Sequence, residues 1–150
     1  MKITSTAFEN NGSIPAVYTC DGSGINPPLV FSEILPEAKG LALLMDDPDV
    51  PKSIRSDGMW DHWVVWNMPP STQGIGEGEM PPGIVGRNTG GGQDYYNPCP
   101  PDGEHRYFFK LYALDIMLDL PAISSKADVE KAMQGHILAA TELIGLYRRQ

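Results

Sequence analysis

A chain of 150 residues is long enough for one domain with a sizeable core and short for several. Its 41% hydrophobic and 20% charged residues are typical of a globular protein, not of a disordered one. The formal net charge of -8 disfavours nucleic acid as a partner, because that binding depends on Lys and Arg side chains that neutralise phosphates. We therefore expect a single domain over residues 1–150.

The N-terminus lacks the apolar stretch of a signal peptide, and the longest tight apolar run, residues 41–45, is too short to span a bilayer. We expect no transmembrane segment and a cytoplasmic location. The chain has two cysteines, Cys20 and Cys99, without the paired spacing of a zinc or redox motif. Two reduced thiols are favoured because disulfides are rare in the cytosol, and one disulfide is the alternative.

Proline and glycine residues lie mostly in clusters between short apolar segments. Such spacing of proline and glycine favours strands joined by irregular loops over a helical bundle, so the predicted fold class is mainly β. The predicted strands are residues 3–8, 14–19, 29–34, 40–45, 62–68 and 105–114.

The segments 62–68 and 105–114 are apolar on both faces. This pattern predicts strands that are covered on both sides, at the centre of the sheet. Residues alternate across a strand, so His62 is expected on the same face as Val64 and Trp66. By the same rule, His105 shares a face with Tyr107. A histidine is therefore predicted near the mouth of each central strand.

The C-terminal part is predicted to be helical. Ser125 followed by Asp128 resembles a capping box, and Gly135 is expected to separate two short helices. Apolar side chains then recur at helical spacing, at Met133, Ile137, Ala140, Ile144 and Tyr147.

Three loops place polar side chains beside the predicted central strands: residues 46–51, 60–63 and 97–107. Prolines stiffen two of these loops, and a stiff loop lowers the entropy cost of holding a small ligand. Carboxylates, imidazoles and a phenol that converge there would form a binding site.

The motifs in these loops resemble those of the phosphatidylethanolamine-binding protein family. Asp47-Pro48-Asp49-Val50-Pro51 resembles the family's D-P-D-x-P motif, and Gly103-Glu104-His105-Arg106 its G-x-H-R motif. His62 lies where the family has its first pocket histidine. The similarity extends from about Thr19 to Tyr147 and is strongest to the short bacterial branch of Raf-kinase-inhibitor-like proteins.

This resemblance implies a sandwich with a large central antiparallel sheet, a smaller second sheet and C-terminal helices. It implies a pocket lined by Asp47, His62, His105 and Tyr107, with a rim shaped by Asp49, Pro51, Pro100 and Pro101. It also suggests Tyr147 as a pocket residue. Because bacterial relatives often form homodimers, the resemblance allows a homodimer here.

The implied ligand is a small anion, phosphate or the phosphoethanolamine headgroup. His62, His105, the Tyr107 hydroxyl and loop amides could donate hydrogen bonds to a phosphate. Asp47 cannot donate while ionised, so we expect it to orient an imidazole or to receive an ammonium group. No cofactor and no metal are expected.

Two other functions stay open. A kinase or serine protease as protein partner is implied by the roles of some relatives, with partner choice expected on exposed segments such as residues 53–59 and 74–80. A metal-dependent phosphoester hydrolase is the less favoured alternative, because no tight metal-ligand spacing or nucleophile elbow appears. We expect a binding protein and not an enzyme.

Overall fold

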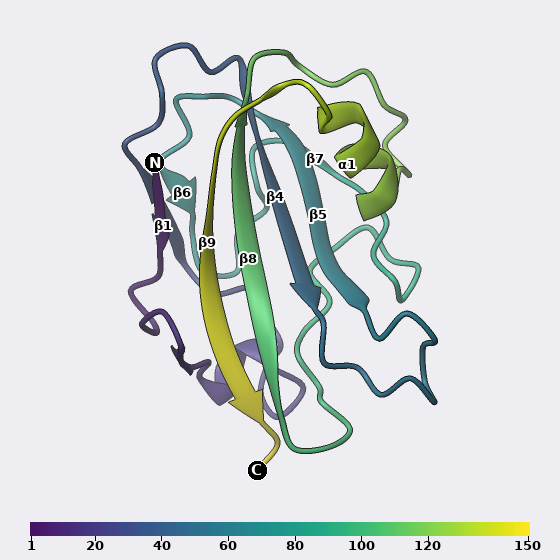
Figure 1. Cartoon of the computed structure of the whole chain (residues 1–150). Helices are drawn as coiled ribbons and strands as arrows, with labels where there is room; N and C mark the ends of the chain where they lie inside the picture. The colour runs from purple at the N-terminus through teal and green to yellow at the C-terminus, as the bar shows by residue number, and fades with distance from the viewer.

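The fold is built on one large sheet whose long strands run the length of the molecule (Figure 1). The structure is a computed structural model that describes residues 1–150. In chain order the elements are β1 (Lys2–Thr4), β2 (Gly12–Ser13), the 3-10 helix η1 (Ala16–Tyr18), β3 (Leu29–Ser32), β4 (Gly40–Asp47), β5 (Trp60–Met68), β6 (Gly74–Ile75), β7 (Ile84–Val85), β8 (Glu104–Leu114), α1 (Lys126–Met133) and β9 (Ile137–Arg148).

The large sheet has the strand order β2-β9-β8-β4-β5-β7, and the small sheet has the order β1-β3-β6. Every pairing is antiparallel except that of β2 with β9. The expected mainly β sandwich of a large and a smaller sheet is confirmed. Strands β4, β5 and β8 at the centre correspond to three of the strands predicted from the sequence.

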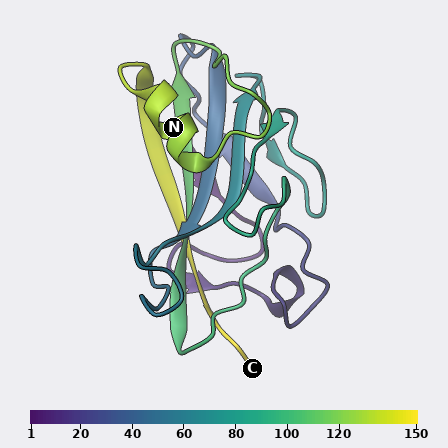
Figure 2. The same ribbon diagram turned by 90° about the vertical axis from the view of Figure 1, so that its right-hand side faces the viewer.

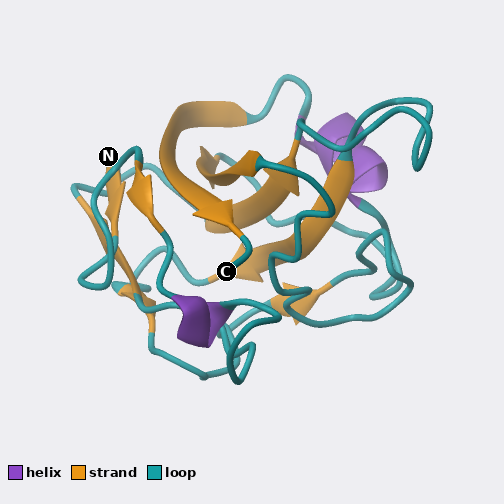
Figure 3. Cartoon of the chain, turned by 90° about the horizontal axis from the view of Figure 1, so that it is seen from below, coloured by secondary structure: helices purple, strands orange, loops and turns teal.

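Both faces of the large sheet are covered, as the doubly apolar central segments predict. One face packs against the small sheet, and Phe31 of β3 belongs to the same core cluster as Leu43 and Phe109 of the large sheet. The other face packs against α1, where Val129 meets Leu44 and Trp66. Seen from below, the small sheet and α1 lie on opposite sides of the large sheet (Figure 3), and Figure 2 shows α1 in front of the long strands. The strands are therefore apolar on both sides because each side faces a different layer.

The expectation of C-terminal helices is only partly correct. The capping box of Ser125 and Asp128 is present and begins the single helix α1, and Gly135 follows the helix with a φ of 80°. From Ile137 onward, however, the chain is a strand, paired with β8 from Glu104 to Leu114. The buried residues Leu143, Gly145 and Tyr147 recur at a period of two, as in a strand, and not at a period of 3.6.

Gly145 provides a direct test of this strand. A Cβ atom at Gly145 would lie 2.5 Å from Ile14 Cγ1 and 2.9 Å from Phe8 Cε2. We expect Gly145→Ala to lower the free energy of unfolding by about 1–3 kcal/mol, through overpacking of the core. Urea denaturation measures the change, and Glu142→Ala, on the exposed face of the same strand, should stay within about 0.5 kcal/mol. A stabilising Gly145→Ala would favour a helix instead, because alanine is the better helix former.

Two further predictions are corrected near the N-terminus. Residues 14–19 do not form a strand but contain η1, which starts after Pro15. Cys20 and Cys99 form a disulfide, with their Cα atoms 5.4 Å apart, in place of the favoured pair of reduced thiols. The disulfide joins the segment after η1 to the proline-rich loop before β8. All peptide bonds are trans, and no helix is long and apolar enough to cross a membrane.

Candidate functional site

A small pocket opens where β4 ends and where β5 and β8 begin, at the lower end of the molecule in Figure 1. Its volume is ≈ 190 Å³. The lining combines a few polar groups with an apolar and aromatic wall: Asp47, Val50, Ile54, Trp60, His62, Tyr96, Cys99, Pro100, Pro101 and Tyr107. The three loops that the sequence singled out therefore meet at one place.

Asp47 is the last residue of β4, and its carboxylate is buried and paired on both oxygens. Oδ2 lies 2.7 Å from Nδ1 of His105, and Oδ1 accepts a hydrogen bond of 2.8 Å from the backbone N–H of Asp49. The expectation that Asp47 orients an imidazole agrees with this geometry. A buried carboxylate of this kind needs such partners, since an unpaired buried charge is costly.

His105 lies behind Asp47 and not in the lining of the pocket. Its second ring nitrogen, Nε2, lies 2.7 Å from Oδ1 of Asp102, so both nitrogens face carboxylates. Burial by itself would lower the pKa of His105, but the hydrogen bonds to Asp47 and Asp102 outweigh burial and raise it. Ionised carboxylates only accept, so a ring protonated on both nitrogens fits this geometry, offsets the charge of Asp47 and has no donor left for a ligand.

A β-bulge turns His62 into the pocket. Met45 is opposite Trp63 on the neighbouring strand, and Asp46 is opposite Asp61, so His62 is the extra residue on β5. Simple alternation placed His62 with Val64 on the helix side of the sheet, and that prediction is wrong. The ring instead packs edge-on against Tyr107, with centroids 5.2 Å apart. Bulges commonly re-aim a side chain in this way beside functional sites.

The tautomer of His62 follows from its partner. Nδ1 lies 2.6 Å from the backbone carbonyl oxygen of Tyr96, which can only accept, so Nδ1 carries the hydrogen. Burial lowers the pKa of His62. The nearby carboxylates and the carbonyl of Tyr96 raise this pKa, but by less, so the net shift is downward. The imidazole is therefore neutral near pH 7, and Nε2 is left as a hydrogen-bond acceptor. This differs from the expectation that His62 donates a hydrogen bond to the phosphate.

Tyr107 supplies the hydroxyl of the pocket. It lies on β8 two residues after His105, and the two rings are stacked with centroids 6.5 Å apart. Burial, followed by the negative charge of Asp47, raises the pKa of Tyr107 well above its usual range. The hydroxyl therefore keeps its proton and can donate a hydrogen bond.

Comparison with known proteins identifies the family of this chain. The sequence profile described as phosphatidylethanolamine-binding protein matches residues 4–148. This chain belongs to the phosphatidylethanolamine-binding protein family. A UPF0098 protein of Methanothermobacter thermautotrophicus is 50% identical, with 99% of each chain covered, and one of Chlamydia muridarum is 48% identical, also with 99% of each chain covered.

Solved structures of this family share the fold. The crystal structure of a putative phosphatidylethanolamine-binding protein homologue from Chlamydia trachomatis has a TM-score of 0.96 and 46% identity, with 99% of this chain and 97% of that chain covered. YbcL of Escherichia coli, described as a member of the mammalian family, has a TM-score of 0.88 and 25% identity, with 99% and 98% covered. The family resemblance inferred from the three motifs is therefore confirmed.

The rim of the pocket in this family member differs from the predicted one. Pro100 and Pro101 line the pocket, whereas Asp49 and Pro51 do not. Asp49 instead accepts two hydrogen bonds from the guanidinium group of Arg106, of 2.9 and 2.8 Å. These bonds lower the pKa of Asp49.

Tyr147 is also outside the pocket of this family member. It lies on β9, directly opposite His105 in the register of the sheet, and its hydroxyl donates to the carboxylate of Asp21. That bond, with those from Arg149, lowers the pKa of Asp21. Tyr147 therefore helps to hold the C-terminal segment against the loop that follows η1.

Sequence reasoning missed half of the lining. Trp60 lies two residues before His62, so its place in a quoted loop could have suggested it. Tyr96 had no such signal, because its role depends on two contacts with His62: its carbonyl oxygen holds the ring, and its N–H donates to the His62 carbonyl at 2.8 Å. The other residues that were missed are Val50, Ile54 and Cys99.

Proposed function

We propose that this protein reversibly binds a small phosphate-bearing group, such as phosphate or phosphoethanolamine, in the pocket at Asp47, His62 and Tyr107. The observation that carries the proposal is the pairing of one donor and one acceptor, the Tyr107 hydroxyl and His62 Nε2, in a pocket of ≈ 190 Å³. Pockets for drug-sized ligands measure about 300–1,000 Å³, so this one suits a headgroup.

The chemistry of the lining favours a phosphate that carries one proton. Tyr107 can donate to an unprotonated phosphate oxygen, and neutral His62 can accept from a protonated one. The charge of Asp47 is offset by the His105 imidazolium, which reduces repulsion of an anion. For phosphoethanolamine, the carboxylate of Asp47 would attract the ammonium group.

Binding of this kind is weak. Two hydrogen bonds to a charged group contribute about 1.5–3 kcal/mol each, before the costs of association and desolvation. We therefore expect dissociation constants of roughly millimolar for the isolated headgroups. A complete lipid would gain further affinity from the exposed apolar side chains at the mouth of the pocket, Ile54 and Tyr96.

We propose binding without turnover. The lining contains no serine, and its one cysteine, Cys99, is held in the disulfide. A hydrolase would need an activated nucleophile or a metal-bound water. Incubation with a phosphate monoester, with and without added divalent metal ions, tests this part of the proposal, and sustained release of phosphate that is lost in His62→Ala would contradict it.

Titration with phosphate and with phosphoethanolamine, followed by amide NMR shifts, tests the proposed ligand. We expect saturable shifts confined to the loops that carry Asp47, His62 and Tyr96, and their loss in His62→Ala. His136→Ala is the matched control, because His136 pairs with Asp115 away from the pocket. An absence of shifts at tens of millimolar ligand would redirect the search to a protein partner.

The same titration predicts a pH dependence. In the proposed complex one proton lies between His62 Nε2 and a phosphate oxygen. At high pH neither free His62 nor the free phosphate carries this proton, so binding must take it up. Affinity should therefore fall by up to about tenfold per pH unit above pH ~6, the second pKa of a phosphate monoester, and level off below it. An affinity that rises from pH 6 to pH 9 would contradict the assigned roles of His62 and Tyr107.

A further inference from the structure

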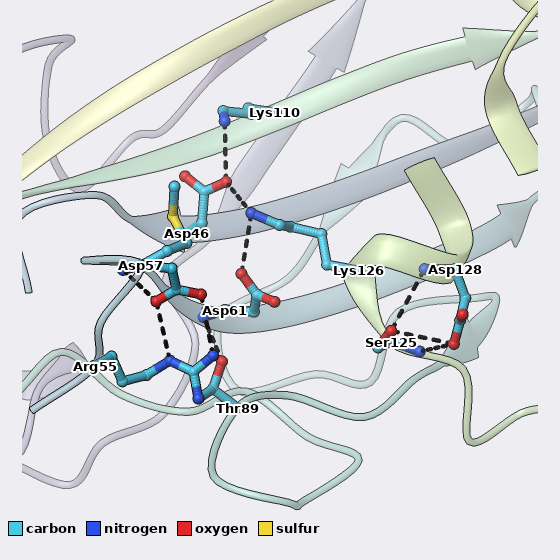
Figure 4. A network of polar contacts seen from close by, with 10 residues as sticks. Asp46, Arg55, Asp57, Asp61, Thr89, Lys110, Ser125, Lys126 and Asp128 are labelled. Carbon is cyan, nitrogen blue, oxygen red and sulfur yellow. Dashed lines mark hydrogen bonds and ion pairs between the residues drawn. The ribbon is translucent and has the colours of Figure 1, made fainter. Parts of the chain in front are cut away.

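A second network of charges lies on the helix side of the large sheet and joins β4, β5 and β8 to the start of α1 (Figure 4). Lys126 Nζ lies 3.0 Å from Asp46 Oδ2 and 3.0 Å from Asp61 Oδ1. Lys110 Nζ, from β8, lies 2.9 Å from the same oxygen of Asp46. Asp46 is 1% exposed, so this pairing takes place inside the protein.

Asp46 and Asp61 each directly precede a pocket residue on the same strand. Asp46 is followed by Asp47 on β4, and Asp61 is followed by His62 on β5. Adjacent residues on a strand point to opposite faces, so Asp46 and Asp47 lie on opposite faces of the sheet. The bulge at His62 brings Asp61 to the face of Asp46 and His62 to the face of Asp47.

This register places two like charges directly opposite each other. Asp46 and Asp61 are cross-strand partners, a position in which two carboxylates destabilise the pairing of the strands. Lys126 is the one cation that contacts both. Burial by itself would lower the pKa of Lys126, but Asp46 and Asp61 outweigh burial and raise it, so the ammonium group stays charged.

The position of Lys126 in its helix supports a role outside the helix. It is the first residue of α1, where a positive charge opposes the helix dipole, and the side chain is nevertheless largely buried. A lysine at this position destabilises the helix, and its ion pairs with Asp46 and Asp61 of the sheet offset that cost. The backbone of Asp61 is held separately, by hydrogen bonds with Thr89 of 2.8 and 3.0 Å.

We propose that Lys126 is a positioning residue for the pocket: by bridging Asp46 and Asp61 it holds β4 and β5 in the bulged register that turns His62 toward Tyr107. The inference rests on the proposed function, since it assigns how the binding site is kept in shape. Lys126 acts through the sheet: its ammonium group contacts Asp46 and Asp61, and Lys126 is not among the residues that line the pocket.

The experiment compares Lys126→Met with the matched control Lys110→Met. Both lysines contact Asp46 Oδ2, but only Lys126 also contacts Asp61. The first readout needs no ligand: imidazole ¹⁵N NMR reports whether His62 keeps its Nδ1–H tautomer. We expect Lys126→Met to lose the single tautomer and Lys110→Met to keep it.

The second readout is phosphate affinity. We expect Lys126→Met to weaken binding by roughly 10- to 150-fold, the loss of one charge-assisted hydrogen bond, and Lys110→Met to change it by less than about fivefold. A folded Lys126→Met protein with the wild-type His62 tautomer would overturn the inference. Absence of phosphate binding by the wild-type protein would overturn the proposed function alone, because the tautomer still decides the role of Lys126.

If Lys126→Met does not fold, a third variant tests the role of Lys126. Lys126→Met combined with Asp61→Asn removes one of the two opposed charges and should restore both folding and the His62 tautomer. A double variant that stays unfolded, or that folds without the Nδ1–H tautomer of His62, would overturn the inference, because relief of the repulsion would then be insufficient.

Discussion

Asp47→Asn is expected to lower the free energy of unfolding by about 3–5 kcal/mol at pH 6, the cost of breaking a buried ion pair by removing one partner. The amide keeps the size of the side chain but leaves the buried His105 imidazolium without the carboxylate that lies 2.7 Å from Nδ1. Binding of phosphoethanolamine should weaken in the same variant, because Asp47 lines the pocket and its carboxylate attracts the ammonium group. Urea denaturation and the NMR titration measure the two effects.

The loss of stability should depend on pH. The pKa of His105 is raised in the folded protein, so its pairing stabilises fully below the ordinary value of about 6.5 and is lost as the pH rises through the raised value. The difference between wild type and Asp47→Asn should therefore be larger at pH 6 than at pH 9.

Asp49→Asn is the control for Asp47→Asn. Asp49 pairs with Arg106, whose side chain is 53% exposed, so the expected loss is about 1 kcal/mol or less and does not change between pH 6 and pH 9. Equal losses in the two variants, or a loss for Asp47→Asn that grows toward pH 9, would show that Asp47 and His105 are not paired in solution.

Removal of the disulfide, by Cys20→Ala combined with Cys99→Ala, should lower the free energy of unfolding by about 2–5 kcal/mol. The bond joins residues 79 positions apart, and such a cross-link restricts the unfolded chain strongly. Cys99 also lines the pocket next to Pro100, so the variant should bind phosphate more weakly than the wild type. Urea denaturation and the phosphate titration measure the two losses.

Reduction provides the matching control. A dithiol reductant should lower the stability of the wild-type protein to that of the double variant, and should leave the double variant unchanged. Denatured, unreduced wild-type protein should show no reactive thiol. Two reactive thiols in protein of full stability would contradict the disulfide.

Local sequence patterns were sufficient for the centre of the fold. The segments that became β5 and β8 are apolar on both faces, and this pattern holds because each face of the sheet is covered by a different layer. The residues Asp47 and Tyr107, which the family resemblance implied for the pocket, lie in its lining. Each lies at or near the end of a central strand, so its position follows from the strand itself.

The C-terminal segment shows where local patterns fail. Residues 137–148 contain apolar side chains compatible with both a period of two and a period of 3.6, and only the pairing with β8 along its full length decides for a strand. The disulfide was only the alternative prediction, because reduced thiols were favoured from the rarity of disulfides in the cytosol. The separation of Cys20 from Cys99 along the chain could not correct this, since it says nothing about their distance in space.

By itself, the sequence determined the mainly β class, the family and the loops that form the pocket, because apolar alternation and short motifs are local properties. The tertiary structure decided the protonation and direction of each histidine. His105 is paired on both nitrogens because Asp47 reaches it from the end of β4 and Asp102 from the loop before β8. His62 enters the pocket because a bulge and the carbonyl of Tyr96 hold it there, and its burial keeps it neutral. These contacts join residues 3 to 58 positions apart, and only the folded chain brings them within hydrogen-bond distance.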